Sequence, residues 1–175
     1  MQILLQERIS EANQLEAIRQ LLILGDKDFI PPLSSRSSST QSTLSTAASE
    51  NGIDDYFETI RTMPTVLALD GDRVAGFMTF RFDHICDQIG PETLPNLYAS
   101  TCVVHPDYRG QGLMTKFYTA MMEHYPHRGI YTRTWHTNFG HLKVLDRLGF
   151  SQLCCLENHR GEGIHTVYYG LSPKA

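Results

Sequence analysis

The residues best suited to chemistry lie in one short segment, His105–Met114, which reads HPDYRGQGLM. The segment follows an apolar, strand-like run and opens a stretch whose apolar residues recur at helical spacing. Glycines at 110 and 112 would leave backbone N–H groups unobstructed at the start of that helix, where the helix dipole favours negative charge. Arg109 adds positive charge. The segment therefore predicts a phosphate or pyrophosphate site; a helix start that uses glycine only for its turn is the alternative.

Other familiar site patterns are missing from the sequence. A Walker loop would read G-x-x-x-x-G-K-[ST], and a dinucleotide-binding turn would need glycine where this chain has Thr115. A serine hydrolase would carry G-x-S-x-G. Neither H-E-x-x-H nor C-x-x-C occurs, so no metal site is predicted. Cys86, Cys102, Cys154 and Cys155 are expected to be reduced and packed as small apolar groups.

The elements that must hold the glycine segment in place follow two periodicities. Apolar residues alternate in the strands and recur at helical spacing in the helices. We predict strands at residues 1–9, 65–70, 73–82, 97–104, 129–135, 150–157 and 164–169. We predict helices at 53–63, 110–125 and 138–148, and an earlier one that Ser10 caps and Gly25 ends. Because several strands form hairpins, the fold class is α/β (α+β), with a mixed central sheet of about six or seven strands flanked by about four helices.

The length and the net charge of the chain limit the number of domains and the classes of binding partner that we expect. A chain of 175 residues and 19.8 kDa predicts a single domain over residues 1–175. The formal net charge of −4 leaves no electrostatic footprint for nucleic acid or an anionic membrane. No apolar run approaches the roughly 18 residues that span a bilayer, and the start, MQILLQERISEANQ, is too polar for a signal peptide. We therefore expect a cytoplasmic protein, monomeric or homodimeric, that binds neither nucleic acid nor membrane.

A serine- and threonine-rich stretch, residues 34–49, interrupts the regular pattern. It carries one charge, at Arg36, and lies inside the domain rather than between two domains. One interpretation is a flexible loop or weak helix in solvent. The other is a cover over a binding site.

Two blocks of the sequence resemble the GNAT N-acetyltransferase superfamily. Residues 105–112 (HPDYRGQG) are similar to its acyl-CoA signature, [QR]-x-x-G-x-[GA]. Residues 138–150 (NFGHLKVLDRLGF) are similar to its N-x-x-A-x-x-x-Y-x-x-x-G-F helix. The resemblance covers residues 65–169 well and the N-terminal part more loosely. It implies an N-acyltransferase that uses acetyl-CoA as acyl donor.

The resemblance also implies cofactor contacts. The segment that would hold the CoA pyrophosphate through its backbone amides comprises Arg109, Gly110, Gln111, Gly112, Leu113, Met114 and Thr115. The strand end that would pair with the pantetheine arm comprises Cys102, Val103 and Val104, and Asn138 would hydrogen-bond the same arm. The acceptor is implied to enter between strands 97–104 and 129–135. Residues 34–49 would then be an acceptor-side lid.

Three residues depart from the family pattern. Met114 replaces the small residue that lets the helix approach the pyrophosphate, so the cofactor is expected to sit slightly differently. His141 replaces the usual alanine and stands near the expected thioester. Leu145 replaces the tyrosine that commonly protonates the leaving thiolate, which removes the usual general acid.

The reaction needs a group that moves protons. An amine with a lysine-like pKa near 10.4 must lose a proton before it attacks the thioester, whereas the CoA thiolate, with a pKa of about 8.5, depends less on an acid. His136, just past strand 129–135, and His141, one turn after Asn138, are the predicted catalytic residues. His84 and Tyr98 are further candidates on the acceptor side. A structural or surface role is the alternative for each.

The predicted reaction is direct attack of a primary amine on the thioester, without an acyl-enzyme. The alternative is a CoA-binding sensor or interaction module without transferase activity, which the leucine at position 145 keeps open. The acceptor is a small-molecule or peptide amine. Peptide N-termini, lysines, polyamines, aminoglycosides and amino acids all fit the sequence, as do different acyl chains.

Overall fold

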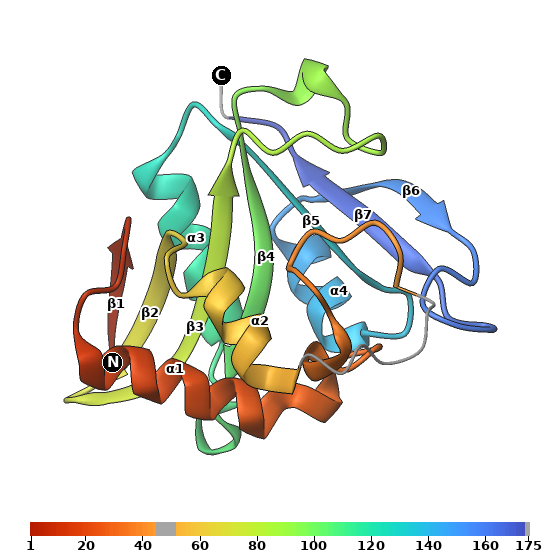
Figure 1. Ribbon diagram of the computed structural model, residues 1–175. Helices are drawn as coiled ribbons and strands as arrows, with labels where there is room; N and C mark the ends of the chain where they lie inside the picture. The colour runs from red at the N-terminus through yellow and green to blue at the C-terminus, as the bar shows by residue number, and fades with distance from the viewer. Residues whose placement is uncertain (45–51, 174–175) are drawn as a thin grey trace.

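The computed structural model describes residues 1–44 and 52–173, and within these ranges the chain forms one mixed sheet with helices on both faces (Figure 1). The strands are β1 (Gln2–Gln6), β2 (Thr65–Asp70), β3 (Arg73–Phe82), β4 (Asn96–Val104), β5 (Gly129–Trp135), β6 (Ser151–Leu156) and β7 (Thr166–Leu171). The α-helices are α1 (Ala12–Gly25), α2 (Gly52–Ile60), α3 (Leu113–His124) and α4 (Phe139–Arg147). The predicted fold class is confirmed.

The strands follow the order β1-β2-β3-β4-β5-β7-β6. Neighbouring strands run antiparallel except β4 and β5, which are parallel and connected through α3. A parallel pair needs such a crossover, whereas the antiparallel β2–β3 pair is joined by a tight turn in which Gly71 adopts φ +59°. The crossover therefore places the glycine segment at the end of β4, in the middle of the sheet.

Each face of the sheet has its own apolar core. Helix α3 packs on one face, where Phe117 and Met121 meet Val66 of β2 and Met78 of β3. Helices α1 and α2 pack on the other face. The buried residues of that second core are Ile18, Leu21, Leu22, Tyr56, Phe57, Ile60, Leu67, Phe77 and Val103. The sheet is thus held rigidly on both sides of β4.

A β-bulge at Ser100 changes the path of β4. Thr79 of β3 pairs with Thr101 and the next residue, Phe80, pairs with Ala99, so Ser100 is an extra residue on the β4 side. The side chains change face there: Ala99 packs with α3, and so does Cys102. Simple alternation would have put Cys102 on the opposite face.

The pairing of β4 with β5 ends at the same level. It joins Asn96–Ala99 to Gly129–Thr132 and goes no further. Residues 100–104 of β4 and 133–135 of β5 therefore have no partner strand on the sides that face each other. The bulge and the lost pairing together open the sheet at its centre.

Several predicted boundaries need correction. Helix α1 begins at Ala12, so Ser10 is not its cap; Glu11 occupies the cap position and makes no side-chain cap hydrogen bond. Helix α2 ends at Ile60, short of the predicted residue 63. Helix α3 begins at Leu113, because Gly110 and Gly112 adopt left-handed φ values of +74° and +75°. All four cysteines are free, as predicted, but Cys155 is exposed and is not packed as a small apolar group.

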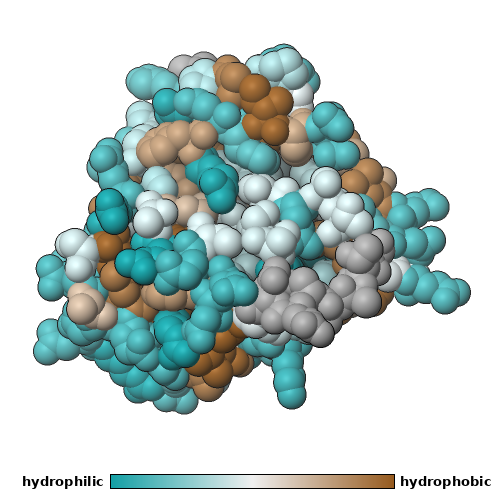
Figure 2. Space-filling view, in the orientation of Figure 1, coloured by the Kyte–Doolittle hydropathy of each residue, from teal (hydrophilic) through white to brown (hydrophobic). Residues whose placement is uncertain are grey.

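The serine-rich stretch is packed where it is described. Within residues 34–44, Arg36, Ser39 and Leu44 are buried, which is unlike a loop in solvent; residues 45–49 of this prediction lie outside the described residues. Elsewhere the face in Figure 2 is largely hydrophilic, with only small separate apolar groups. In the described residues no helix is long and apolar enough to cross a membrane.

Candidate active site

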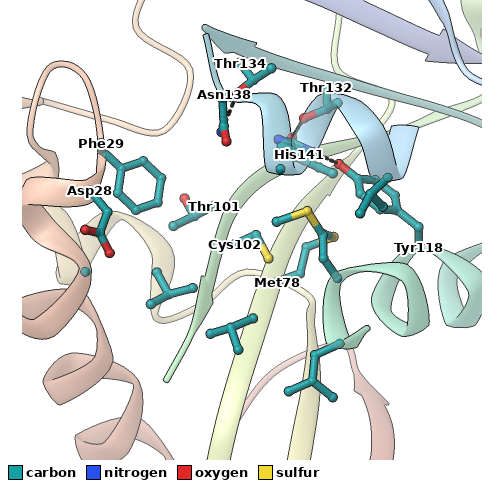
Figure 3. A pocket seen from close by; sticks show the side chains of 18 of the residues that line it. Asp28, Phe29, Met78, Thr101, Cys102, Tyr118, Thr132, Thr134, Asn138 and His141 are labelled. Atoms are coloured by element: carbon teal, nitrogen blue, oxygen red, sulfur yellow. Dashed lines mark hydrogen bonds between the residues drawn. The ribbon is translucent and has the colours of Figure 1, made fainter. Parts of the chain in front are cut away.

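A cavity of about 560 Å³ lies where the sheet opens. Figure 3 shows Thr101 and Cys102 of β4 between two walls, with Asp28 and Phe29 on one side and Tyr118 and His141 on the other. Nearly all of the predicted cofactor contacts line this cavity: Cys102, Val103, Val104, Arg109, Gly110, Gly112, Leu113, Met114, Thr115, Asn138 and His141. Gln111 does not line it; its side-chain amide donates to the carbonyl of Asp107. Segments distant in the sequence therefore meet at one site.

The start of α3 offers backbone donors to this cavity. In the first turn of any α-helix, the backbone N–H groups have no hydrogen-bond partner inside the helix. In α3 the first backbone hydrogen bond of the helix runs from Lys116 N to Gly112 O, 3.1 Å. Gly112 is the cap residue and supplies no side-chain hydrogen bond. The amides of Leu113 and Met114 are thus left free for a ligand, as the glycine segment predicts.

Arg109 lines the cavity but already has partners. Its Nη2 lies 2.7 Å from a carboxylate oxygen of Asp28, and its Nε donates to the carbonyl of Val104 at 3.1 Å. Both partners of the Arg109–Asp28 ion pair are about half exposed. The pair links the end of α1 to the start of α3, so the charge expected of Arg109 is partly offset.

Two further cations near the same end were missed by sequence reasoning. Lys143 and Arg147 lie on α4, four residues apart, and both line the cavity. Both are exposed, and neither takes part in an ion pair within the part of the chain that the structure describes. Their spacing, on the same predicted helix as Asn138, was the signal that could have found them.

His141 and Tyr118 form a hydrogen-bonded pair in the cavity wall. The phenol oxygen of Tyr118 and Nε2 of His141 are 2.8 Å apart (Figure 3). Burial lowers the pKa of His141 to about 4, so the imidazole is neutral at pH 7. Burial also raises the pKa of Tyr118. Tyr118 was not among the predicted site residues, because it lies at helical spacing among the apolar residues of α3.

His136 lies apart from this cavity. Its ring stacks on His165 at 4.4 Å, and its Nδ1 accepts from the His165 backbone N–H at 3.1 Å. The neighbouring Asn138 does line the cavity, and its side-chain amide donates to Thr134 Oγ1 at 2.9 Å. The structure therefore brings His141 and Asn138 together and leaves His136 outside.

The other two acceptor-side candidates also lie outside the lining. The His84 and Tyr98 rings are 4.5 Å apart, and Tyr98 is almost fully buried. Burial, with the nearby guanidinium groups of Arg81 and Arg133, lowers the pKa of His84. Neither residue lines this cavity, and His84 lines a second, separate pocket together with Arg81.

Three arginines complete the lining on the α1 side of the sheet: Arg36, Arg133 and Arg160. We call them the arginine cluster. Arg36 follows the short 3₁₀ turn Leu33–Ser35, Arg133 is on β5, and Arg160 precedes β7. None was predicted, because their sequence positions are far apart and share no motif.

Comparisons with known proteins bear on the family and on the fold. The model of the acetyltransferase (GNAT) family matches residues 34–150. An N-acetyltransferase from Staphylococcus aureus Mu50 is 17% identical, with a TM-score of 0.65 over 99% of this chain and all of that one. The ribosomal-protein-S18-alanine N-acetyltransferase from Escherichia coli is 13% identical, with a TM-score of 0.61 over 99% of this chain and 96% of that one.

A third structure contains a ligand. The yncA protein from Salmonella typhimurium, solved with its cofactor acetyl-CoA, is 12% identical, with a TM-score of 0.66 over 98% of this chain and 94% of that one. No curated protein matches the sequence. The structural likenesses establish the fold, and the family model covers most of the chain. The chain therefore belongs to the GNAT family of acetyltransferases.

Proposed function

We propose that this protein transfers the acetyl group of acetyl-CoA to a primary amine by direct attack on the thioester. The observation that carries the proposal is one continuous cavity. It begins at the free amides of α3, follows the unpaired edge of β4 and reaches the gap between β4 and β5. A donor and an acceptor held along this path would meet without an acyl-enzyme, and orientation alone can supply a large share of the rate.

The residues present fit acetyl-CoA. The amides that open α3 suit a pyrophosphate, and Lys143 and Arg147 add mobile positive charge beside it. The free edge of β4 suits a pantetheine arm, because amide groups can pair with an unpaired strand. Asn138 stands at the edge of the same path. When bound, acetyl-CoA supplies the activated acyl group.

We propose that His141 acts as a neutral hydrogen-bonding group rather than as the base. A pKa of about 4 makes it a weak acceptor for the proton of an ammonium near pKa 10. The proton would instead leave through water in the open cavity. This proposal keeps His141 in the active site but changes its role from the predicted one.

We further propose that Tyr118 replaces the missing tyrosine of the family pattern. Position 145 holds a fully buried leucine, so no acid is available there. The Tyr118 hydroxyl lines the cavity and is held by His141, so it can take over the tyrosine's role as the hydrogen-bonding group for the thiolate. Because burial raises its pKa, it would stabilise a developing thiolate by hydrogen bonding more than by full proton transfer.

The function can be tested by two measurements on the purified protein. Acetyl-CoA should raise the unfolding temperature, with a stabilisation of about 2.7 kcal/mol at 100 times its Kd. Thiol release should rise above background with at least one member of a broad amine panel, and mass spectrometry should show the acetylated amine. Binding without thiol release for every amine would favour the non-catalytic CoA-binding module. No thermal shift at millimolar acetyl-CoA would refute both.

A further inference from the structure

The arginine cluster concentrates positive charge inside the protein. Arg36 and Arg160 are only 5% and 6% exposed, and Arg133 is half-buried beside them. Burial lowers the pKa of Arg160 most, and the charges of Arg36 and Arg133 lower it further, so the guanidinium groups act on one another electrostatically. Taking charged groups out of water is costly unless an opposite charge compensates them. The cluster therefore calls for a counter-charge.

In residues 1–44 and 52–173, carboxylates supply only a small part of that counter-charge. The ion pairs of these residues do not include any member of the arginine cluster. Asp26 acts on Arg36 from a distance and raises its pKa slightly, but its two oxygens accept from Ser34 N and Ser34 Oγ at 2.7 and 2.8 Å. Asp28, which also lines the cavity, is paired with Arg109. Asp26 therefore compensates Arg36 only weakly and from a distance, and the charge of Asp28 is offset by Arg109.

The phenols around the cluster are not anions either. Burial raises the pKa of Tyr56, Tyr98 and Tyr168, so all three are neutral at pH 7. Burial lowers the pKa of Arg36 to about 10 and of Arg160 to about 9, yet both values stay above neutrality. The cluster therefore keeps its positive charge under ordinary conditions.

Two members of the cluster hold the surrounding loops. Arg36 donates through Nε and Nη2 to the carbonyl of Pro31, at 3.0 and 2.8 Å. Arg160 donates to the carbonyl of Ile30 at 2.6 Å and to Thr166 Oγ1 at 2.9 Å. These bonds fix where the guanidinium groups lie. They leave part of each guanidinium available to a ligand.

Arg133 is the member with the most unused donor capacity. Its Nη1 makes one long hydrogen bond, 3.4 Å, to the Tyr168 hydroxyl. Its Nη2 is buried and has no hydrogen-bond partner in the described part of the chain. Buried polar groups are almost always satisfied, so an orphaned guanidinium nitrogen in a cavity wall points to a ligand that completes it.

Building on the acetyl-CoA-dependent function proposed above, we propose that the acceptor is a small amine that also carries a carboxylate or a similar oxyanion, and that the arginine cluster binds this anion. A guanidinium fork matches a carboxylate or phosphate in shape and charge. The burial of Arg36 and Arg160 means that the anion must enter the cavity, which favours a small molecule. Polyamines and aminoglycosides, which carry only positive charge, would be repelled.

The cluster lies where an acceptor would need it. Arg133 directly follows Thr132, the last residue of β5 that pairs with β4. Along β5, Arg133 points to the face opposite Thr132 and Thr134, and Thr134 holds Asn138 on the proposed cofactor side. The anion and the acyl donor would thus occupy opposite faces of the same gap, with the amine between them.

The first test compares matched acceptors with the unmodified protein. Each of a set of L-amino acids would be assayed beside its amide and beside the amine that lacks the carboxyl group, with 2-aminoethylphosphonate and taurine as other oxyanions. Thiol release and product mass would be recorded. We expect kcat/KM to be at least about tenfold higher for the preferred oxyanion-bearing amine than for its uncharged counterpart.

The second test removes the unpaired guanidinium. Arg133→Gln should raise the KM of the preferred oxyanion acceptor about 10- to 100-fold while the Kd of acetyl-CoA changes less than about twofold. Arg133→Lys keeps the charge without the fork and should fall between Gln and the unmodified protein. Arg81→Gln is the control, since Arg81, on β3 and two strands away from β5, is also partly buried but does not line the cavity.

The outcomes separate this inference from the function on which it rests. Turnover of amides and simple amines as fast as of their carboxylate counterparts would overturn the inference and leave the acetyltransferase function intact. Weaker acetyl-CoA binding in Arg133→Gln with an unchanged acceptor KM would also overturn it, because the cluster would then serve the donor. Better turnover of acidic peptides than of every small amine would overturn the small-molecule assignment. Absence of acetyl-CoA binding would instead overturn the proposed function.

Discussion

The two sides of the cavity recognise their ligands by different means. On the side of α3 and α4, the donors fixed in the cavity wall are backbone amides, with the exposed side chains of Lys143 and Arg147 beside them, and the buried His141–Tyr118 pair is electrically neutral. On the side of α1, recognition would depend on the arginine cluster, whose members come from three separate segments. This difference predicts how strongly a side-chain substitution should affect ligand binding on each side of the cavity. Backbone donors do not depend on side-chain identity, whereas removing a single guanidinium removes most of its contribution.

The largest effect should come from placing a negative charge among the backbone donors. Gly112→Asp puts a carboxylate at the cap of α3, where like charges would meet at a cost of several kcal/mol. We expect the Kd of acetyl-CoA, measured by calorimetry, to rise at least about 100-fold.

Gly112→Asn is the matched control for that variant. Asparagine has nearly the same shape and tolerates the left-handed φ of +75° about as well, but it carries no charge. It should weaken acetyl-CoA binding far less than aspartate does. Equal losses in the two variants would mean that shape, rather than charge, decides binding at this end.

A smaller effect should follow from removing the hydroxyl on the neutral side. Tyr118→Phe leaves the ring in place and deletes the group that we expect to stabilise the thiolate, so kcat should fall about 10- to 100-fold with little change in acetyl-CoA Kd. Tyr125→Phe is the control, because the Tyr125 hydroxyl is buried without a hydrogen-bond partner among the described residues and Tyr125 does not line the cavity. An unchanged kcat in Tyr118→Phe would remove Tyr118 from the mechanism.

The neutrality of His141 also predicts how stability depends on pH. Its folded pKa of about 4 lies below the unfolded value of 6.5, so the unfolded state binds more protons between these two values. The contribution is fully present above pH 6.5 and is lost as the pH falls toward 4. By pH 5 about 2 kcal/mol of unfolding free energy has been lost.

Denaturant unfolding of the unmodified protein and of His141→Phe would measure this contribution. The unmodified protein should lose more stability between pH 7 and pH 5 than the variant, by about that amount. Parallel pH profiles would show that His141 is not buried in its neutral form, and the contrast between the two sides would then fail.

The smallest effect on acetyl-CoA binding is expected from the Arg109–Asp28 ion pair, which lies between the two sides of the cavity. Asp28→Asn frees Arg109 from its ion pair and removes a negative charge near the phosphate end. Exposed pairs are worth at most about 1 kcal/mol, so acetyl-CoA should bind up to about fivefold more tightly, and less so at high salt. Weaker binding in this variant would indicate that the ion pair holds the site in its binding shape.

The fold, and the backbone donors at the start of α3, were predictable from the sequence for one physical reason. Strand alternation, helical spacing and the two glycines are local patterns, and each is set by neighbours in the sequence. The predicted bounds of β2, β3 and β5 match those observed. Ser10 failed as a cap because the choice between adjacent residues at a helix end depends on small energies that tertiary contacts override.

The arginine side was not predictable because nothing local marks it. Arg36 sits in a serine-rich stretch that suggests solvent, yet it is buried against the carbonyl of Pro31. Tyr118 shows the same limit in a different way, since its position on an apolar helix face hides the hydroxyl that meets His141. A feature built from segments far apart in sequence needs the fold before it can be recognised.

The extra residue at Ser100 shifts the alternation of side chains along β4 by one position. Before it, odd-numbered side chains such as Ala99 face α3; after it, even-numbered ones such as Cys102 do. Deleting Ser100 would return the strand to a single phase. Thr101 and Cys102 would keep their present faces, because plain alternation from Ala99 without Ser100 gives the same order, and the edge that the cavity leaves free could then pair with β5. A single residue would thus decide whether β4 and β5 separate to form the cavity or stay paired along their length.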